Sequence, residues 1–193
     1  MARDVSASLE DPFVAAGLRV LAERGAAELT VRRVAEVAGA STMGIYTRFG
    51  GRAGMLEAIY RRGFVLLRAA LVEARDVAPP GRRVLPLVRA YRRFALGNPA
   101  LYGLLFERPL PGFDPSPQVR AEALGETFGL LTDELAGDVR RAYVVWTAVH
   151  GAVSIELTHA RRSPLPGFFL DFAEAGEQLL VDSVEALLAG TAR

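Results

Sequence analysis

The chain has 193 residues, of which 51% are hydrophobic and 23% are charged, a composition typical of a globular protein with a buried core. Cysteine is absent, which excludes disulfide bonds and thiolate metal sites. The net charge of +1 excludes a polycation that binds nucleic acid over its whole surface. The longest apolar run, residues 143–157, is interrupted by polar residues and is shorter than the roughly 18 residues of a membrane span. Because the N-terminus also lacks a signal-peptide pattern, we expect a soluble, cytoplasmic protein with no membrane partner.

Four helices are predicted before the first strong break in the chain, over residues 9–24, 30–38, 42–49 and 52–77. Gly25 can end the first helix, because a residue without Cβ adopts the left-handed conformation at low cost. Thr30 and Ser41 precede the second and third helices and are candidate N-caps. Gly39 lies in the short turn between these two helices, and the APPG sequence at residues 78–81 ends the fourth.

The helical pattern continues beyond this break. Further helices are predicted over residues 82–96, 100–106, 119–135, 140–161 and 168–188. Glycine and proline cluster in the loops between them, most densely at residues 107–117, which hold four prolines. No long stretch alternates with the period of two that is typical of a strand, and no internal repeat is found. The sequence therefore predicts an all-α fold with about nine helices.

The second and third helices have the outline of a helix-turn-helix, with a short turn that contains a glycine. In this motif the second of the two helices lies in the major groove of DNA, with its N-terminal residues on the base edges. Ile45 and Phe49, four residues apart, are expected to seat the third helix on the core. The residues left facing outward are Thr42, Met43, Tyr46, Thr47 and Arg48.

Positive charge is concentrated in the same region. Residues 29–52 contain four arginines and one acid, whereas residues 53–193 carry 16 arginines and 16 acids. A small basic surface suits contact with phosphate, although four arginines at this density can equally form a solvated face. Arg52 follows two glycines at the start of the fourth helix, where the arginine and the free backbone amides can hold a phosphate.

Residues 13–56 resemble the DNA-binding domain of the TetR family of transcriptional regulators. The matching features are the LAERG end of the first helix, the Thr-Val-Arg opening of the second, the VAEVAG run, and the Ser-x-x-x-x-Tyr-x-x-Phe-Gly pattern of the third. The resemblance implies that residues 1–52 bind double-stranded DNA and makes Thr30 and Tyr46 candidates for phosphate contact. The predicted DNA-binding residues are Thr30, Arg32, Ser41, Thr42, Met43, Tyr46, Thr47, Arg48 and Arg52.

This chain departs from the family pattern at two of these positions. Many relatives carry Lys or Arg where Thr42 stands, so weaker electrostatic binding or a different operator is expected. Many also carry Lys near Arg52, where arginine serves equally well as a phosphate contact.

The sequences YRRFALGNPALYGLLFERP (91–109) and WTAVHGAVSIEL (146–157) resemble a C-terminal subclass of the same family with a Trp…His-Gly signature. The resemblance implies that residues 53–193 form a ligand-responsive domain and that the protein is a homodimer on a palindromic operator. In the family the last two helices pair with their symmetry mates in a four-helix bundle. The candidate dimer residues are Gly151, Ala152, Ile155, Leu179, Leu180, Val184 and Leu187, for each of which monomer core is the alternative.

Aromatic residues cluster where a pocket for a small-molecule effector is expected. Trp146 and His150, four residues apart, share a helix face and offer an indole N–H and an imidazole to a mostly apolar ligand. The predicted ligand-binding residues are Phe94, Tyr102, Phe106, Phe113, Phe128, Trp146 and His150, with Phe168 near them. A packed core with satisfied polar groups is the alternative for each.

An enzyme is the main rival class. Glu156 and His159 form an E-x-x-H pair, which is half of a di-iron site in some helical bundles. The only other histidine, His150, lies on the opposite face of the same helix, and no acid on its face orients it toward Ser154. No catalytic residue, metal site or cofactor is therefore predicted.

The prediction is a TetR-like DNA-binding regulator, most simply a repressor that a small apolar or amphipathic ligand releases from DNA. The alternatives are a helical small-molecule-binding protein and a cofactor-free enzyme, in which the second and third helices only pack. Salt-dependent binding to a palindromic duplex distinguishes the regulator from both.

Overall fold

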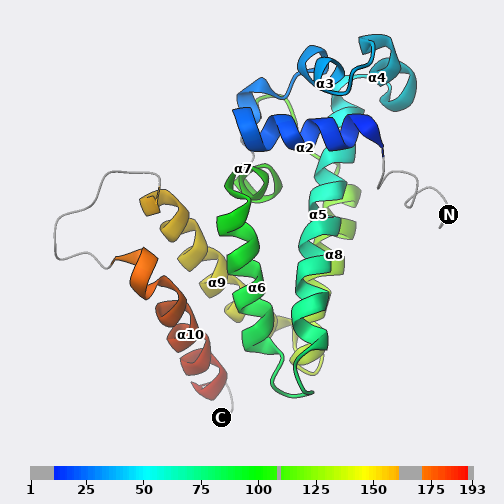
Figure 1. The fold of residues 1–193 in the computed structure, drawn as a ribbon. Helices are drawn as coiled ribbons and strands as arrows, with labels where there is room; N and C mark the ends of the chain where they lie inside the picture. The colour runs from blue at the N-terminus through cyan, green and yellow to red at the C-terminus, as the bar shows by residue number, and fades with distance from the viewer. Residues whose placement is uncertain (1–10, 108–109, 161–170, 191–193) are drawn as a thin grey trace. The chain divides into compact units, whose positions relative to one another are not determined.

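The computed structural model describes residues 11–107, 110–160 and 171–190 (Figure 1). Over these residues the chain forms nine α-helices and no strand, which confirms the predicted all-α fold. A 3₁₀ turn at Ala26–Glu28 and a π-helical segment at Gly103–Glu107 complete the regular structure. No helix in this part of the chain is both long and apolar enough to span a bilayer.

The first four helices are α2 (Pro12–Arg24), α3 (Val31–Val37), α4 (Thr42–Phe49) and α5 (Arg52–Asp76). The bounds predicted for α3, α4 and α5 are confirmed to within a residue, and Gly25, with φ 81°, ends α2 as expected. The predicted start of α2 at residue 9 is wrong, because Asp11 has an extended backbone and caps the helix. Its Oδ1 accepts hydrogen bonds from the amides of Phe13 at 2.9 Å and Val14 at 3.3 Å.

The two predicted N-caps behave differently. Thr30 Oγ1 accepts a hydrogen bond from the Arg33 amide at 3.2 Å and so caps α3. Ser41 occupies the N-cap position of α4, but its side chain makes no capping hydrogen bond.

The remaining helices are α6 (Val84–Gly97), α7 (Pro99–Tyr102), α8 (Pro117–Glu134), α9 (Val139–Ala160) and α10 (Phe172–Gly190). The short helix predicted over residues 100–106 is one α-helical turn that continues as a π-helix. The predicted start of the last helix, residue 168, lies outside the described residues. The Asp171 carbonyl accepts the first helical hydrogen bond, from the Ala175 amide, so that α10 begins at Phe172. Residues 168–170 and the predicted loop at 163–167 lie outside the described residues.

The helices pack into two compact units. Unit 1 comprises the chain up to Leu66 together with residues 98–124, and unit 2 comprises residues 67–97 and the chain from Gly125 onward. Helices α5 and α8 therefore contribute to both units. The predicted boundary at residue 52 does not coincide with a boundary between these units. It is drawn between a DNA-binding and a ligand-binding function, and this functional division stays a prediction.

Unit 1 is built on α2, which packs against α3 and α7. Figure 1 shows α3 and α4 on one side of α2 and α7 on the other. The core side chains beneath these helices are fully buried and come from α2, α4 and α5: Leu21, Ile45, Met55, Leu56 and Ile59.

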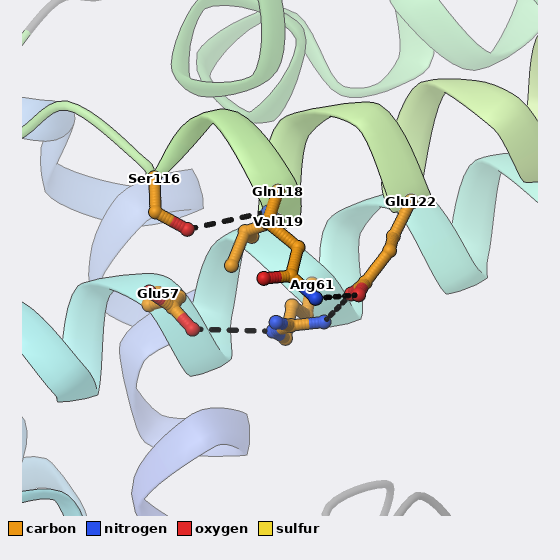
Figure 2. A network of polar contacts seen from close by, with 6 residues as sticks. All are labelled: Glu57, Arg61, Ser116, Gln118, Val119 and Glu122. Carbon is orange, nitrogen blue, oxygen red and sulfur yellow. Dashed lines mark hydrogen bonds and ion pairs between the residues drawn. The ribbon is translucent and has the colours of Figure 1, made fainter.

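A polar network in unit 1 joins α5 to the start of α8 (Figure 2). Arg61 of α5 donates hydrogen bonds to Glu57 at 3.3 Å and to Glu122 of α8 at 2.9 Å. Ser116 Oγ accepts from the Val119 amide and caps α8. The hydrogen bond from Arg61 lowers the pKa of Glu122. Burial opposes the charge of Arg61, but the hydrogen bonds to Glu122 and Glu57 outweigh it and raise the pKa of Arg61.

Unit 2 is built on α9, which packs against α6 and α10. A buried ion pair lies among these helices: Arg92 of α6 contacts Glu156 of α9 through two hydrogen bonds, at 2.8 and 2.5 Å. A Cβ on Gly176 of α10 would lie only 2.9 Å from Glu156 Oε1. Glycine at this position therefore lets α10 approach the ion pair closely.

Candidate nucleic-acid interface

The turn between α3 and α4 is fixed by local hydrogen bonds. Gly39 has φ 64°, and its amide donates to the Glu36 carbonyl at 3.1 Å. The Ala40 amide donates to the Ala35 carbonyl at 3.0 Å, so the two bonds close the C-terminus of α3 in a Schellman motif. This geometry reverses the chain and sets where α4 begins.

Helix α4 is seated on α2 and on the start of α5. Ile45 is completely buried, and Phe49 packs edge-to-face on Phe13 of α2, with ring centroids 6.1 Å apart. Two glycines allow close approach. A Cβ on Gly44 would lie 2.7 Å from Phe13 Cζ, and one on Gly54 would lie 2.0 Å from the Phe49 carbonyl oxygen. The expected roles of Ile45 and Phe49 as core anchors are confirmed.

The opposite side of α4 is exposed. Met43 is 69% exposed and Tyr46 is 55% exposed, and Thr42 and Thr47 are also exposed. The Tyr46 ring lies beside Gly51, where a Cβ would be 3.5 Å from its Cε1 atom. We call the surface formed by Thr42, Met43, Tyr46 and Thr47 the reading face. It combines methyl groups, hydroxyls and one phenol.

The arginines of this region differ in their partners. Arg33 forms ion pairs with Glu36 at 2.9 Å and with Glu28 at 3.4 Å. Arg32 and Arg52 are exposed and form no ion pair with any residue in the described ranges. Among the described residues, the positive charge of this region that no acid pairs therefore comes from Arg32 and Arg52, which is less than the number of arginines in the sequence implied.

Arg48 does not project freely into solvent. Its Nε donates a hydrogen bond to Asp11 Oδ2 at 2.9 Å, and the Asp11 side chain is only 4% exposed. The sequence reasoning missed Asp11. An Asp followed by Pro is a common start of a helix, so the capping role was visible in the sequence. The contact with Arg48 was not, because 37 residues separate the two.

The predicted ligand-binding residues fall into two sets. In unit 2, Trp146 stacks on His150 with ring centroids 5.1 Å apart, and Phe128 lies 6.3 Å from Trp146. Tyr91 Oη is hydrogen-bonded to His150 Nδ1 at 2.9 Å. Tyr143 contacts both Phe128 and Trp146. The shared face of Trp146 and His150 is confirmed, and the sequence reasoning missed Tyr91 and Tyr143.

The other set lies in unit 1. Tyr102 and Phe106 are in ring contact at 5.1 Å, Phe106 contacts Phe64, and Phe113 contacts Tyr60. Tyr102 is buried, which agrees with its alternative assignment to the core. Phe94 is buried on α6 in unit 2, and Phe168 lies outside the described residues.

The predicted dimer residues differ in exposure. Leu180 and Val184 are buried within the protomer, as in their alternative assignment to monomer core. Ile155 is 49% exposed, and Leu179 is also exposed. The half-buried members are Gly151, Ala152 and Leu187.

Helix α9 exposes more apolar surface than the sequence reasoning assigned to it. Val139 and Tyr143, four residues apart, are exposed on one side near the start of the helix, whereas Ile155 is exposed farther along the helix and on a different side. Between them the Thr147 hydroxyl donates to carbonyls of its own helix, at 2.9 and 3.0 Å. The Thr147 hydroxyl can therefore lose water without being left unsatisfied.

In the E-x-x-H pair of α9, both carboxylate oxygens of Glu156 are bound to Arg92. The carboxylate is therefore not available to a metal ion in this arrangement. The side chain of His159 lies outside the described residues. In the described part of the chain, no three acidic or histidine side chains gather in a way that would hold a metal ion.

Comparison with known proteins identifies the arrangement of α2 to α5. Residues 13–59 match the family model of bacterial regulatory proteins of the tetR family, and residues 84–182 match that of the tetracyclin repressor-like C-terminal domain. The chain belongs to the TetR family. It is a DNA-binding transcriptional regulator, and α3 and α4 are its helix-turn-helix.

A curated relative agrees with this assignment, and solved structures share the fold. The HTH-type transcriptional regulator Mb1846 of Mycobacterium bovis is 26% identical to this TetR-family chain, over 80% of the chain and 83% of the relative. The crystal structure of the regulatory protein SCO4313 has a TM-score of 0.75 and 22% identity, and covers 98% of both chains. FadR from Bacillus subtilis, crystallised with stearoyl-CoA, has a TM-score of 0.70 and 16% identity, and covers 93% of this chain and 97% of FadR.

Proposed function

We propose that this TetR-family regulator binds a palindromic operator as a homodimer and represses transcription until a small apolar or amphipathic effector releases it. The observation that carries the proposal is the two-sided character of α4. Ile45 is fully buried, whereas Met43 and Tyr46, on either side of it in the sequence, are mostly exposed. Large apolar and aromatic side chains held outward on a well-seated helix are typical of a binding surface.

The reading face has the chemistry for both kinds of DNA contact. Thr42 and Met43 lie at the N-terminal end of α4, the end that reaches base edges, and their methyl groups suit the thymine methyl. The Thr47 hydroxyl and the Tyr46 phenol suit bases or phosphates. Ser41 supports this assignment, because its hydroxyl makes no capping bond and is available to DNA.

Phosphate contacts are assigned to the charged and hydroxyl groups around this face. Arg32 and Arg52 have no acidic partner in the described part of the chain, and Arg52 is the first residue of α5, where free amides add to its charge. The Thr30 hydroxyl accepts the capping bond of α3 and keeps its own proton for a phosphate oxygen. A single helix-turn-helix with two such arginines is expected to bind DNA only weakly. The proposal therefore requires a second helix-turn-helix.

A dimer supplies the second helix-turn-helix. Two recognition helices one helical turn of DNA apart, about 34 Å, contact successive major grooves. Exposed Ile155 of α9 and Leu179 of α10 support a surface that pairs the two helices with a second copy. Gly151 and Ala152 add small side chains that permit close helix packing.

The effector site is assigned to the aromatic cluster of unit 2. Trp146, His150 and Tyr91 combine their rings with three polar groups, an indole N–H, an imidazole and a phenol, which suits a ligand with an apolar body and one polar end. The stearoyl-CoA bound to FadR is amphipathic in this sense, and that ligand class is consistent with the cluster.

Selection of duplexes from a random-sequence pool tests the DNA part of the proposal. Enrichment of one sequence with two-fold symmetric half-sites supports it, and a pool that stays unenriched contradicts it. Trp146 is the only tryptophan of the chain, so its fluorescence reports on the aromatic cluster alone. Titration with fatty acids and with acyl-CoA is expected to change this fluorescence and to release the selected duplex at the same concentrations.

A further inference from the structure

We infer that Asp11 is a positioning residue for DNA recognition, which fixes the guanidinium of Arg48 and thereby sets how the reading face meets the duplex. The inference rests on the proposed DNA-binding role of α4. It concerns a residue that lies before the first helix and outside the helix-turn-helix, and it assigns Arg48 to the phosphate backbone rather than to bases.

The carboxylate of Asp11 links two helices. Oδ1 accepts two backbone amides at the start of α2, and Oδ2 accepts Nε of Arg48 near the end of α4. The carboxylate is almost completely buried, so water does not compete for these bonds. Phe13, two residues later, packs on Phe49, the residue after Arg48. The start of α2 therefore contacts the end of α4 through one ion pair and one ring contact.

This contact restricts what Arg48 can do. Its side chain is 53% exposed although Nε is engaged, and its two terminal nitrogens form no hydrogen bond with a residue that the structure describes. A guanidinium held at Nε can present only its terminal N–H groups to a ligand, in one direction. Arg48 is the seventh residue of the eight-residue helix α4, far from the N-terminal end that reads bases. Its fixed direction therefore suits a phosphate oxygen.

Asp11 also changes the charge balance. Its negative charge offsets that of Arg48 and reduces attraction to DNA of any sequence. The ion pair thus lowers the affinity for DNA of any sequence and fixes the direction of the Arg48 guanidinium. Both effects raise the ratio of specific to non-specific binding.

The variant Asp11→Asn separates the two effects. Asparagine keeps the oxygen that caps α2, but its amide nitrogen cannot accept the bond from Arg48. Affinity is measured for the selected operator and for a scrambled duplex of the same length and composition. We expect affinity for the scrambled duplex to rise about two- to fivefold at low salt. We expect the ratio of specific to non-specific affinity to fall roughly tenfold.

Glu36→Gln is the matched control, because it removes the same charge from a partner of Arg33 on α3 and leaves the bond between Asp11 and Arg48 intact. It is expected to raise affinity for the scrambled duplex without lowering the ratio. Arg48→Lys keeps the charge but lacks the forked donors, and is expected to lower the ratio by a similar factor. Asp11→Asn added to Arg48→Gln is expected to change the ratio no further.

A parallel change of both affinities in Asp11→Asn, in either direction, or no change in either, would overturn the inference. Thermal unfolding is used to choose an assay temperature at which every variant is folded, so that a parallel loss of affinity counts against the inference. The proposed function fails separately: if Arg52→Gln and Tyr46→Ala also leave operator affinity unchanged, the reading face itself is wrongly assigned.

Discussion

The carbonyl oxygen of Phe49, the last residue of α4, occupies the space that a side chain on Gly54 would need. An ideal Cβ on Gly54 lies 2.0 Å from this oxygen, and a backbone atom cannot move aside as a side chain can. The end of the recognition helix therefore rests directly on the first turn of α5. The reading face and Arg52 are held in one geometry by this contact.

Gly54→Ala is expected to reduce the free energy of unfolding by about 1–3 kcal/mol, because the added methyl group must displace backbone. Operator affinity is expected to fall with it, since α4 shifts relative to Arg52. Chemical denaturation and duplex binding measure the two effects. Gly129→Ala in α8 is the control: nothing lies within 4 Å of its Cβ, so helix propensity alone predicts a gain of up to ~1 kcal/mol. Equal effects of the two substitutions would contradict the argument.

The buried ion pair of unit 2 makes a second prediction. Arg92→Met leaves the buried Glu156 carboxylate without its charged partner and is expected to cost about 3–5 kcal/mol of unfolding free energy. Glu177 also contacts Arg92, at 3.6 Å, but is half exposed. Glu177→Gln is therefore expected to cost less than about 1 kcal/mol. A loss of the same size in both variants would show that the burial of Glu156 does not determine the loss of unfolding free energy.

The pair of Arg61 and Glu122 predicts a dependence of stability on pH. The pKa of Glu122 is lowered from 4.5 in the folded state, chiefly by the hydrogen bond from Arg61. Its contribution to stability is therefore complete above pH 4.5 and is lost as the pH falls through the lower folded-state pKa, because the unfolded chain binds the proton first. Glu122→Gln is expected to lower the melting temperature at neutral pH and to match the native protein in acid.

Glu73, exposed on the same helix as Arg61, provides the control for this measurement. It forms no ion pair with any residue that the structure describes. Glu73→Gln is expected to leave the difference in melting temperature between neutral and acidic solution unchanged. A Glu122→Gln protein that still loses the same stability in acid as the native protein would refute the assignment.

The proposed dimer surface is tested by charge insertion. Ile155→Glu or Leu179→Glu places a charge on apolar surface that the dimer would bury, and each is expected to raise the dimer dissociation constant at least tenfold. Val77→Glu alters a large hydrophobic residue that is 83% exposed and should leave assembly unchanged. Sedimentation or light scattering gives the mass. Native protein that is monomeric at every concentration would contradict the dimer.

Local patterns in the sequence predicted the helices well and their long-range contacts poorly. Gly25, Gly39 and Thr30 act through bonds to residues a few positions away, so their roles were visible in the sequence. The pairing of Asp11 with Arg48 joins residues far apart, and no periodicity reports such a contact.

Helical spacing also places residues on a face without showing what covers that face. Leu180 and Ile155 both follow the apolar pattern of their helices, yet Leu180 is buried in the protomer and Ile155 is exposed. Similarly, spacing placed Trp146 beside His150 but could not place Tyr91 of α6 against the imidazole.

The salt dependence of operator binding tests the central claim most directly. Arg52→Gln removes an uncompensated charge beside the reading face, and Arg93→Gln removes an exposed charge from α6 in unit 2. The slope of log affinity against log salt concentration is expected to decrease by about 0.9 for each phosphate that the protein no longer neutralises. A smaller slope in Arg52→Gln and an unchanged slope in Arg93→Gln is the predicted result. Equal slopes in both variants and the native protein would contradict DNA binding through α4 and the start of α5.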